Sequence, residues 1–290
     1  MRRQFRDTIM DLAKDDPSIM LVFGDVSVYL FNDFKQRYPD RFFNLGICEN
    51  SIISVSGGLS SQGFTPFAHT IAPFLTERSY EQIKLDLCYN QFAANIVTCG
   101  ATFDYAWDGA THHSYTDLAI LRLLPGMEVI QPGSRKELEA LLRSQYHNDR
   151  VTYFRLSDHP HQIEMPVEFG KGVLLQDRKA RLTVMTAGPL LENVLPAVQD
   201  LEVNLVYFHT LKPIDHELIA SFRDTEIVVV HDAFGLYEAI CEVPGIRTFY
   251  HGLKDQFYCL YGTLTQIRQH AGLDVQGIRD VVRERLKHVL

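Results

Sequence analysis

The chain has 290 residues, of which 46% are hydrophobic and 22% are charged, and this balance excludes disordered, collagen-like and disulfide-stapled proteins. The formal net charge of -8 argues against nucleic acid or an anionic membrane surface as a partner. The length predicts two globular domains. Because the amino-terminal segment lacks a signal-peptide apolar core and no apolar run reaches the roughly 18 residues of a spanning helix, we expect a cytoplasmic protein.

Five cysteines lie in mostly apolar surroundings and form no C-x-x-C pair. Their odd number argues against a zinc site or a disulfide framework. We therefore expect all five to be reduced core thiols.

In the first half of the chain, short apolar runs alternate with helix-like segments, as in α/β proteins with parallel sheets. Strands are predicted at 21–26, 95–100, 127–132 and 151–156. Helices are predicted at 50–63, 77–90, 116–124 and 134–148. The last helix has Ser134 as its expected N-cap and Glu137 at the capping-box position.

The sequence becomes polar between 157 and 177, and a second series of strands and helices follows. Its strands are predicted at 181–188, 203–210 and 225–233, and its helices at 189–200, 216–222 and 274–290. The predicted fold class is α/β, with two doubly wound domains at residues 1–163 and 178–290 and a linker at 164–177. We expect a mainly parallel sheet in the first domain.

Active sites of such folds lie at the carboxyl ends of the strands, so the segments that follow strands are the places to search for chemistry. Four of them stand out, namely GDVS (24–27), NLGICEN (44–50), HTIAPF (69–74) and GATFDYAWDGATHHS (100–114). Glu49 is surrounded by apolar residues at the start of a predicted helix. Burial there would raise the pKa of the carboxyl group, whereas the alternative is a glutamate that only stabilises the helix dipole.

The segment 40–84 resembles the pyrimidine-binding domain of transketolases, in which an N-hydrophobic-Gly-Ile-x-Glu motif precedes a glycine-rich helix and a Phe-containing loop. The resemblance continues through DGATHH (108–113) and LPGMEVIQPGSRKE (124–137). The second series, including LKPID (211–215), resembles the transketolase carboxyl-terminal domain. The resemblance covers essentially the whole chain and gives both predicted domains their expected folds.

This resemblance implies thiamin diphosphate as the cofactor, whose own atoms carry the difficult chemistry. It makes Glu49 the catalytic acid that favours the imino form of the pyrimidine, and it places Phe74 on the pyrimidine face. Asp25 and Ile47 are the other expected cofactor-binding residues. From the residues alone, Phe74 could equally be a core side chain, and Asp25 could cap an Asx turn.

The same resemblance assigns His112 to catalysis and Asp108 to substrate binding. Further substrate-binding candidates come from the same loop and its surroundings, namely His69, Trp107, His113 and Arg155. The alternative is that the loop histidines are only solvated. A zinc site is not supported, because neither an HExxH helix nor paired cysteines occur.

Half of a transketolase is absent from this sequence. The GDG motif and the later Asn that hold magnesium and the diphosphate are missing, because Gly24-Asp25 continues as Val26. The chain therefore resembles the carboxyl-terminal subunit of a split transketolase and has no metal site of its own. An amino-terminal partner subunit is expected to hold Mg²⁺ or Ca²⁺ and the diphosphate, within a heterotetramer in which this chain also self-associates.

Three positions differ from relatives that use sugar phosphates. Gly100 and Asp158 stand where those relatives have a histidine and an arginine, and Trp107 replaces an acidic residue. These differences argue against simple ketose phosphates and favour a small sugar without a terminal phosphate, or a nucleotide-linked one. The alternative is that Arg155, Arg122 or a partner arginine supplies the positive charge.

Two other functions remain open at this point. The beta subunit of a 2-oxoacid dehydrogenase decarboxylating component shares both domains, the glutamate and a loop histidine. A non-catalytic scaffold subunit would keep the fold alone. DGATHH and RSYEQIK (78–84) resemble transketolase more closely than the dehydrogenase, and the presence of both Glu49 and Phe74 argues against a scaffold. The preferred prediction is therefore a transketolase-type transferase that moves a two-carbon ketol unit between small sugar-like substrates.

Overall fold

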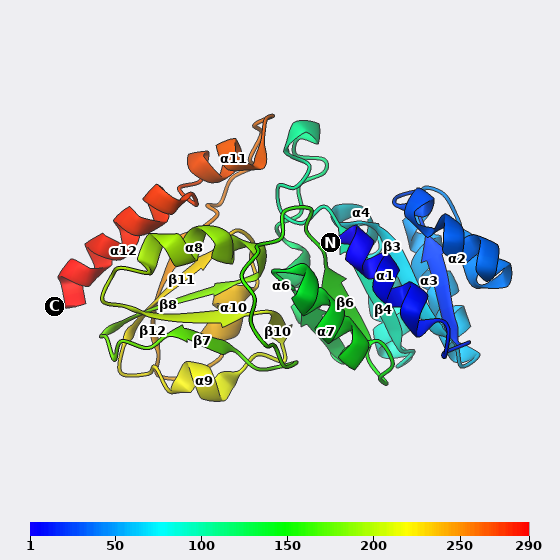
Figure 1. Ribbon diagram of the computed structural model, residues 1–290, viewed down its shortest axis with the longest axis horizontal. Helices are drawn as coiled ribbons and strands as arrows, with labels where there is room; N and C mark the ends of the chain where they lie inside the picture. Colours follow the sequence, from blue (N-terminus) through cyan, green and yellow to red (C-terminus); the bar gives the residue numbers. More distant parts are fainter. Residues whose placement is uncertain (290) are drawn as a thin grey trace.

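A computed structural model describes residues 1–289 of the chain, which form two β-sheets with helices on both faces (Figure 1). The predicted α/β class with doubly wound sheets is confirmed. The first sheet is mainly parallel, as expected, with a single antiparallel strand at one edge. The boundaries at 163 and 178 stay a prediction.

The first sheet has seven strands in the order β10-β5-β6-β4-β3-β1-β2. Their bounds are β1 (Ile19–Phe23), β2 (Phe42–Asn44), β3 (Thr65–Ile71), β4 (Ala94–Cys99), β5 (Met127–Ile130), β6 (Val151–Arg155) and β10 (Thr210–Lys212). The helices of this half are α1 (Arg2–Leu12), α2 (Asn32–Arg37), α3 (Glu49–Ser61), α4 (Ala72–Thr76), α5 (Tyr80–Gln82), α6 (Asp117–Arg122) and α7 (Arg135–Gln145).

Alternate side chains of each strand enter different cores, since successive residues of a strand point to opposite faces. In β1, Phe23 belongs to the same buried cluster as Phe5 of α1 and Leu138 of α7, whereas Val22 belongs to the cluster that contains Ile52 of α3. The two apolar layers hold helices on both faces of the sheet. Figure 1 shows α1 and α7 together on one face, with α3 beyond the sheet.

The second sheet has five strands in the order β12-β11-β8-β9-β7, and β7 is antiparallel to β9. Its strands are β7 (Val173–Gln176), β8 (Leu182–Ala187), β9 (Asn204–Phe208), β11 (Glu226–His231) and β12 (Arg247–Gly252). Its helices are α8 (Leu191–Val198), α9 (His216–Ala220), α10 (Leu236–Cys241), α11 (Leu264–His270) and α12 (Val275–Val289). β7 falls within the segment that the sequence predicted as linker.

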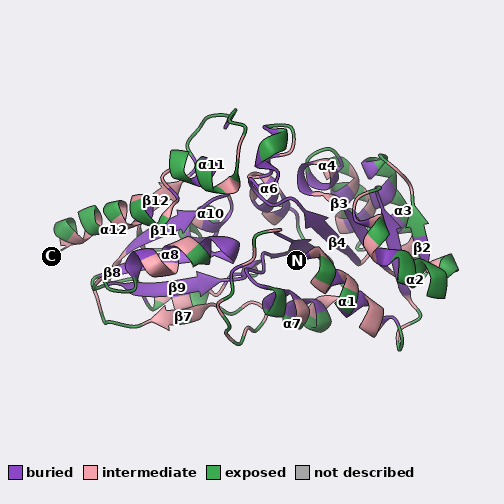
Figure 2. Ribbon diagram, turned by 45° about the horizontal axis from the view of Figure 1, so that its top comes forward, coloured by how far each residue is buried: buried purple, intermediate pink, exposed green. Residues whose placement is uncertain are grey.

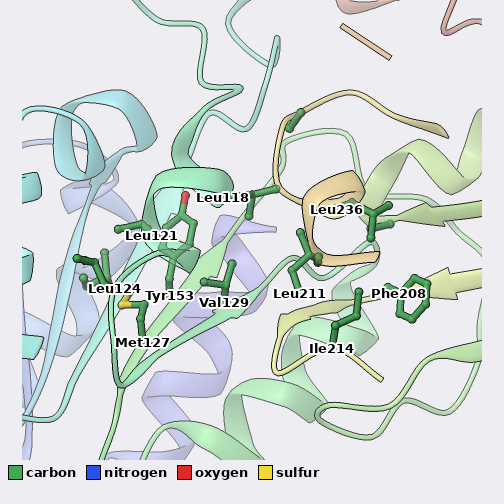
Figure 3. Packing of buried hydrophobic residues seen from close by; sticks show 14 of the residues in the cluster. Leu118, Leu121, Leu124, Met127, Val129, Tyr153, Phe208, Leu211, Ile214 and Leu236 are labelled. Atoms are coloured by element: carbon green, nitrogen blue, oxygen red, sulfur yellow. The ribbon is translucent and has the colours of Figure 1, made fainter. Parts of the chain in front are cut away.

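A shared core joins the two halves. β10, which follows β9 in the chain, leaves the second sheet and pairs with β5 of the first. The close-up in Figure 3 shows Leu211 and Leu236 facing Leu118 and Val129 across this junction, and all of them are fully buried. The halves therefore pack as one continuous hydrophobic unit at this point.

Several expectations at the level of elements need correction. The sequence did not predict α1, β2, β3, β7, β10, β12, α10 or α11. Ser134 caps α7 as predicted, by accepting from the Glu137 amide, but the Glu137 carboxylate accepts from Gly133 instead of closing the box on Ser134. The cysteine prediction was wrong in part, since only Cys99 is buried and three of the five are exposed. Within residues 1–289, no helix combines the length and apolarity that crossing a bilayer requires.

Candidate active site

The candidate site begins with Glu49, the first residue of α3. No side chain caps this helix, and the acidic group lies in its first turn, where the helix dipole favours negative charge. The Glu49 side chain is only 3% exposed. The residue that the sequence selected for chemistry is therefore a buried carboxyl group at a helix N-terminus.

Arg78 and Phe74 complete the surroundings of this carboxyl group. Arg78 Nη1 donates to Glu49 Oε2 over 2.7 Å, and the guanidinium carbon lies 4.7 Å from the centre of the Phe74 ring. A flat, nitrogen-rich cation thus lies against the Phe74 ring while bonded to Glu49. The space between the two residues suits a planar hydrogen-bonding group.

The Phe74 ring also reaches the predicted substrate loop. Its centre lies 5.1 Å from that of the His112 ring, in an edge-to-face arrangement. Tyr105 lies next to both His112 and Trp107, with ring centres 6.4 and 5.6 Å apart. Glu49, Phe74, His112 and Trp107 are thereby linked through Arg78 and Tyr105, so the structure brings these four predicted residues into one region.

The substrate loop, residues 100–114, carries exposed groups at its tip. Trp107 is 60% exposed, Asp108 is exposed, and neither side chain has a hydrogen-bond partner within residues 1–289. His112 Nδ1 pairs with Thr111 over 2.9 Å, and its Nε2 has no partner in the same part of the chain. Figure 2 shows this loop above α6 with its tip drawn as exposed. These side chains are available to a ligand.

The structure explains why position 100 is a glycine, which the sequence did not reveal. Its φ of +80° is a conformation that side chains disfavour, and an added Cβ would lie 2.5 Å from the Tyr105 ring. Tyr105 therefore fills the place that a larger residue at this position would need. The absence of a side chain at Gly100 therefore allows the loop to pack, independently of any effect on the substrate pocket.

The two cofactor-binding candidates in the preceding loops differ in their surroundings. Asp25 is exposed and exchanges two hydrogen bonds with Asn44, since its amide donates to Asn44 Oδ1 and its carboxylate accepts from Asn44 Nδ2. Its φ of +61° fits the turn that was its alternative interpretation. Ile47 lies before α3, and its side chain is 74% exposed among residues 1–289.

Arg155 is almost entirely buried, because only 1% of its side chain is exposed, and it forms an ion pair with Asp117. Its Nε donates to Asp117 over 2.7 Å, and Nη2 donates to Thr102 and to the Ser114 carbonyl. Thr102 and Ser114 also form an isolated β-bridge at the base of the substrate loop. Arg155 therefore holds the loop in place through Nε and Nη2, and its burial leaves almost no surface to a substrate.

His69 is a core residue in this structure. Its ring lies between those of Phe5 and Phe23, and its two nitrogens pair with the Val97 carbonyl and with Ser27. Burial lowers the pKa of His69 to about 4. Because neither ring nitrogen of His69 is free, the structure gives no support to the expectation that His69 binds substrate.

His113 is also removed from the tip of the loop. It is 4% exposed and packs edge-to-face on Phe103, with ring centres 5.0 Å apart. Burial lowers the pKa of His113, and neither ring nitrogen has a hydrogen-bond partner within residues 1–289. It supports the loop from beneath, while His112 faces Phe74.

The charge argument against a phosphate substrate is weakened by Arg2. Its guanidinium makes two hydrogen bonds to the Asp158 carboxylate, at 3.1 and 2.9 Å, which neutralises that charge. Burial raises the pKa of the nearby Asp104 carboxyl group to about 6. Arg122 is no substitute cation, since it is bound to the Leu211 carbonyl and to Glu242. A phosphate would thus meet neither a free anion at Asp158 nor a free cation at Arg122.

The sequence did not single out Arg78, Tyr105 or Asn44. Arg78 lies within the RSYEQIK string that carried part of the resemblance, but its contact with Glu49 joins residues 29 positions apart. Tyr105 and Asn44 lie inside the segments selected for inspection, so their positions were a usable signal. Their partners depend on how the loops fold back.

Comparison with known proteins identifies the family. Residues 1–159 match the family described as transketolase, pyrimidine binding domain. The chain is 30% identical to an apulose-4-phosphate transketolase subunit of Phocaeicola vulgatus, over 99% of this chain and 97% of that protein. It is 29% identical to the 1-deoxy-D-xylulose-5-phosphate synthase of Pseudomonas aeruginosa, over 87% of this chain and 42% of that enzyme.

Solved structures of transketolases show the same fold. A structure described as a split gene transketolase, inactive beta4 tetramer, superposes with a TM-score of 0.87 at 28% identity, over 100% of this chain and 99% of that chain. Campylobacter jejuni transketolase shares the fold, with a TM-score of 0.85 at 17% identity, over 98% of this chain and 46% of that chain.

The chain is an α/β protein that belongs to the transketolase pyrimidine-binding family, a thiamin diphosphate-dependent family. Within that family it is a carboxyl-terminal subunit of the split transketolase type.

Proposed function

We propose that this chain forms the pyrimidine-binding side of a thiamin diphosphate site and, with an amino-terminal partner, transfers a two-carbon ketol unit between sugar-like substrates. The family supports a transferase of the transketolase type. The reaction, the partner and the cofactor contacts are the proposal. We further propose that the protein is cytoplasmic.

The observation that carries the proposal is the pairing of a buried carboxyl group with an aromatic face. Glu49 and Phe74 both contact the planar guanidinium of Arg78, Glu49 by a hydrogen bond at its edge and Phe74 at its face. An aminopyrimidine has a similar flat shape, and its ring nitrogen could accept a hydrogen bond from the same carboxyl group when that group holds a proton. The residues present therefore fit the cofactor, with Phe74 stacking and Glu49 hydrogen-bonding to a ring nitrogen.

When bound, thiamin diphosphate would supply a carbon nucleophile and an electron sink for cleavage of a carbon–carbon bond. Glu49 would hold a proton toward the pyrimidine ring nitrogen, in a dry environment that strengthens the bond. Phe74 would fix the plane of the ring. Asp25 and Ile47, both exposed at the same edge of the first sheet, would contact the cofactor from its open side.

The tip of the substrate loop would bind the sugar. His112 Nε2 and the Asp108 carboxylate have no partner within residues 1–289, and both suit hydroxyl groups or proton transfer. Trp107 would offer an apolar face and one N–H donor. Arg155 and His113 would act by holding the loop in position. The name of the Phocaeicola relative makes apulose 4-phosphate a substrate to test beside unphosphorylated sugars.

A partner subunit would supply the metal and the diphosphate contacts. No cluster of three or more His, Cys, Asp or Glu residues that could hold a metal ion occurs within residues 1–289. We propose a heterotetramer of two amino-terminal and two carboxyl-terminal subunits, with obligate interfaces above about 2,000 Å². Mg²⁺ or Ca²⁺ would then be bound by the partner.

Reconstitution tests this proposal. The chain is mixed with an amino-terminal transketolase subunit encoded beside it, thiamin diphosphate and magnesium, and the transfer of a two-carbon unit between ketose and aldose is followed by mass spectrometry. We expect transfer only with both subunits present. Oxoacid-dependent reduction of an electron acceptor in place of ketol transfer would instead favour the dehydrogenase alternative, and tight cofactor binding by this chain alone would contradict the split site.

A further inference from the structure

Arg78 makes both contacts that the proposed function assigns to the cofactor. Its guanidinium is bonded to Glu49 and lies 4.7 Å from the centre of the Phe74 ring. The same two side chains would bind the aminopyrimidine ring from its edge and its face. The Arg78 guanidinium and the pyrimidine ring cannot both contact Glu49 and Phe74 at the same time. Binding of one therefore excludes the other.

The Arg78 side chain is able to leave. It is 46% exposed, whereas Glu49 is 3% exposed, so water already reaches the guanidinium from one side. Its backbone is fixed separately, because the Arg78 amide donates to the Pro73 carbonyl and its own carbonyl accepts from Asn50 Nδ2. The side chain can therefore rotate outward while the backbone that follows α4 stays in place.

The contact also has a purpose in the free subunit. A buried carboxylate without a partner is strongly unfavourable, and Arg78 is the one cation bonded to Glu49 within residues 1–289. A planar guanidinium satisfies the carboxylate and the aromatic face together, which a lysine ammonium would do less well. The arginine thus stabilises the site until the cofactor arrives.

We propose that Arg78 is a displaceable substitute for the cofactor pyrimidine, which must swing away from Glu49 and Phe74 for thiamin diphosphate to bind. This inference rests on the proposed function. In the closed position, the Arg78 guanidinium competes with the pyrimidine ring for Glu49 and Phe74. The apparent affinity for the cofactor is therefore lower than the affinity of the open site. Removing the guanidinium should therefore tighten cofactor binding.

Isothermal calorimetry on the assembled two-subunit complex tests this with a binding constant in place of activity. Thiamin diphosphate is titrated with magnesium in excess into wild type, Arg78→Ala and the matched control Lys84→Ala, which removes one exposed cation from the segment that follows α5. We expect Arg78→Ala to lower Kd by about 3- to 10-fold, in line with the loss of one half-exposed ion pair and one cation–π contact. Lys84→Ala should leave Kd within about 2-fold of wild type.

A second pair of variants separates competition from a general effect of charge. In a Glu49→Gln background Arg78 has lost its anionic partner, so Arg78→Ala should change Kd much less than it does with Glu49 present. Arg78→Lys should fall between wild type and Arg78→Ala.

The outcomes are distinct. An unchanged or raised Kd for Arg78→Ala, with wild type binding normally, would overturn the role of Arg78 and leave the proposed function standing. A wild-type complex that binds no cofactor, while the circular dichroism spectrum shows it folded, would refute the proposed function and with it this inference.

Discussion

Replacing Arg155 with methionine should destabilise the protein and loosen the substrate loop. The Arg155 and Asp117 side chains are 1% and 0% exposed, and their ion pair is 2.7 Å long. Methionine keeps an unbranched apolar stem without the guanidinium, and it leaves a buried carboxylate whose remaining bond comes from Tyr153. Breaking a buried pair in this way typically costs about 3 to 5 kcal/mol.

The assay is urea unfolding followed by far-UV circular dichroism, together with the fluorescence of Trp107. Because Trp107 is the only tryptophan and lies on the loop that Arg155 holds, its emission and anisotropy report the loop directly. In Arg155→Met we expect the tryptophan to become more mobile in the folded protein. The double variant Arg155→Met/Asp117→Leu should regain much of the stability, because it removes the stranded charge.

Arg143→Met is the matched control. Arg143 also forms ion pairs, with Asp11 and Glu139, but all three side chains are exposed by 39% or more. Such exposed pairs contribute little to stability, because water and salt screen them. If Arg155→Met costs no more than Arg143→Met and leaves the anisotropy of Trp107 unchanged, the reasoning about the buried network is wrong.

Three further predictions follow from the packing. Gly100→Ala should cost about 1 to 2 kcal/mol for its positive φ alone and should displace Tyr105, which the Trp107 spectrum detects; a variant with wild-type stability and spectrum would contradict this. Because burial lowers the pKa of His69 to about 4, the contribution of its neutral ring to stability is complete above pH 6.5 and is lost as the pH falls toward 4. The urea midpoints of His69→Asn should therefore vary less with pH than those of wild type. Parallel curves for the two proteins would exclude this role. Leu211→Ala should lower the unfolding free energy by about 2 to 5 kcal/mol, because the side chain fills the core between the halves, and a cost below about 1 kcal/mol would show that this core is not closely packed.

The parts of the fold that the sequence predicted are those with a local signal. The buried parallel strand β11 contains the continuous apolar run 227–230, and the capped helix α7 carries its own start signal at Ser134. β10 has only three residues and joins a sheet from the other half, so its partner is set by long-range packing. β3 carries a proline, a histidine and two threonines, which hide its apolar character.

The same distinction applies to the site. Glu49 and Phe74 belong to motifs that are short and ordered, and the structure links them through Arg78. Arg155 and His69 looked like site residues because their types suit chemistry, but burial decides their roles, and burial depends on elements far away in the chain. No local pattern shows that Asp117 or Val97 lies beside them.

The central claim is that Glu49 activates the cofactor, and hydrogen–deuterium exchange at the thiazolium C2 position tests it most directly. The two-subunit complex is loaded with thiamin diphosphate and magnesium, and exchange is quenched and measured by NMR for wild type and Glu49→Gln. An amide cannot donate the carboxyl proton, and loss of one acid–base group typically slows a step by about 10² to 10⁴. We predict slowing within that range in a complex that still assembles and binds the cofactor, and an exchange rate equal to that of wild type would contradict the account.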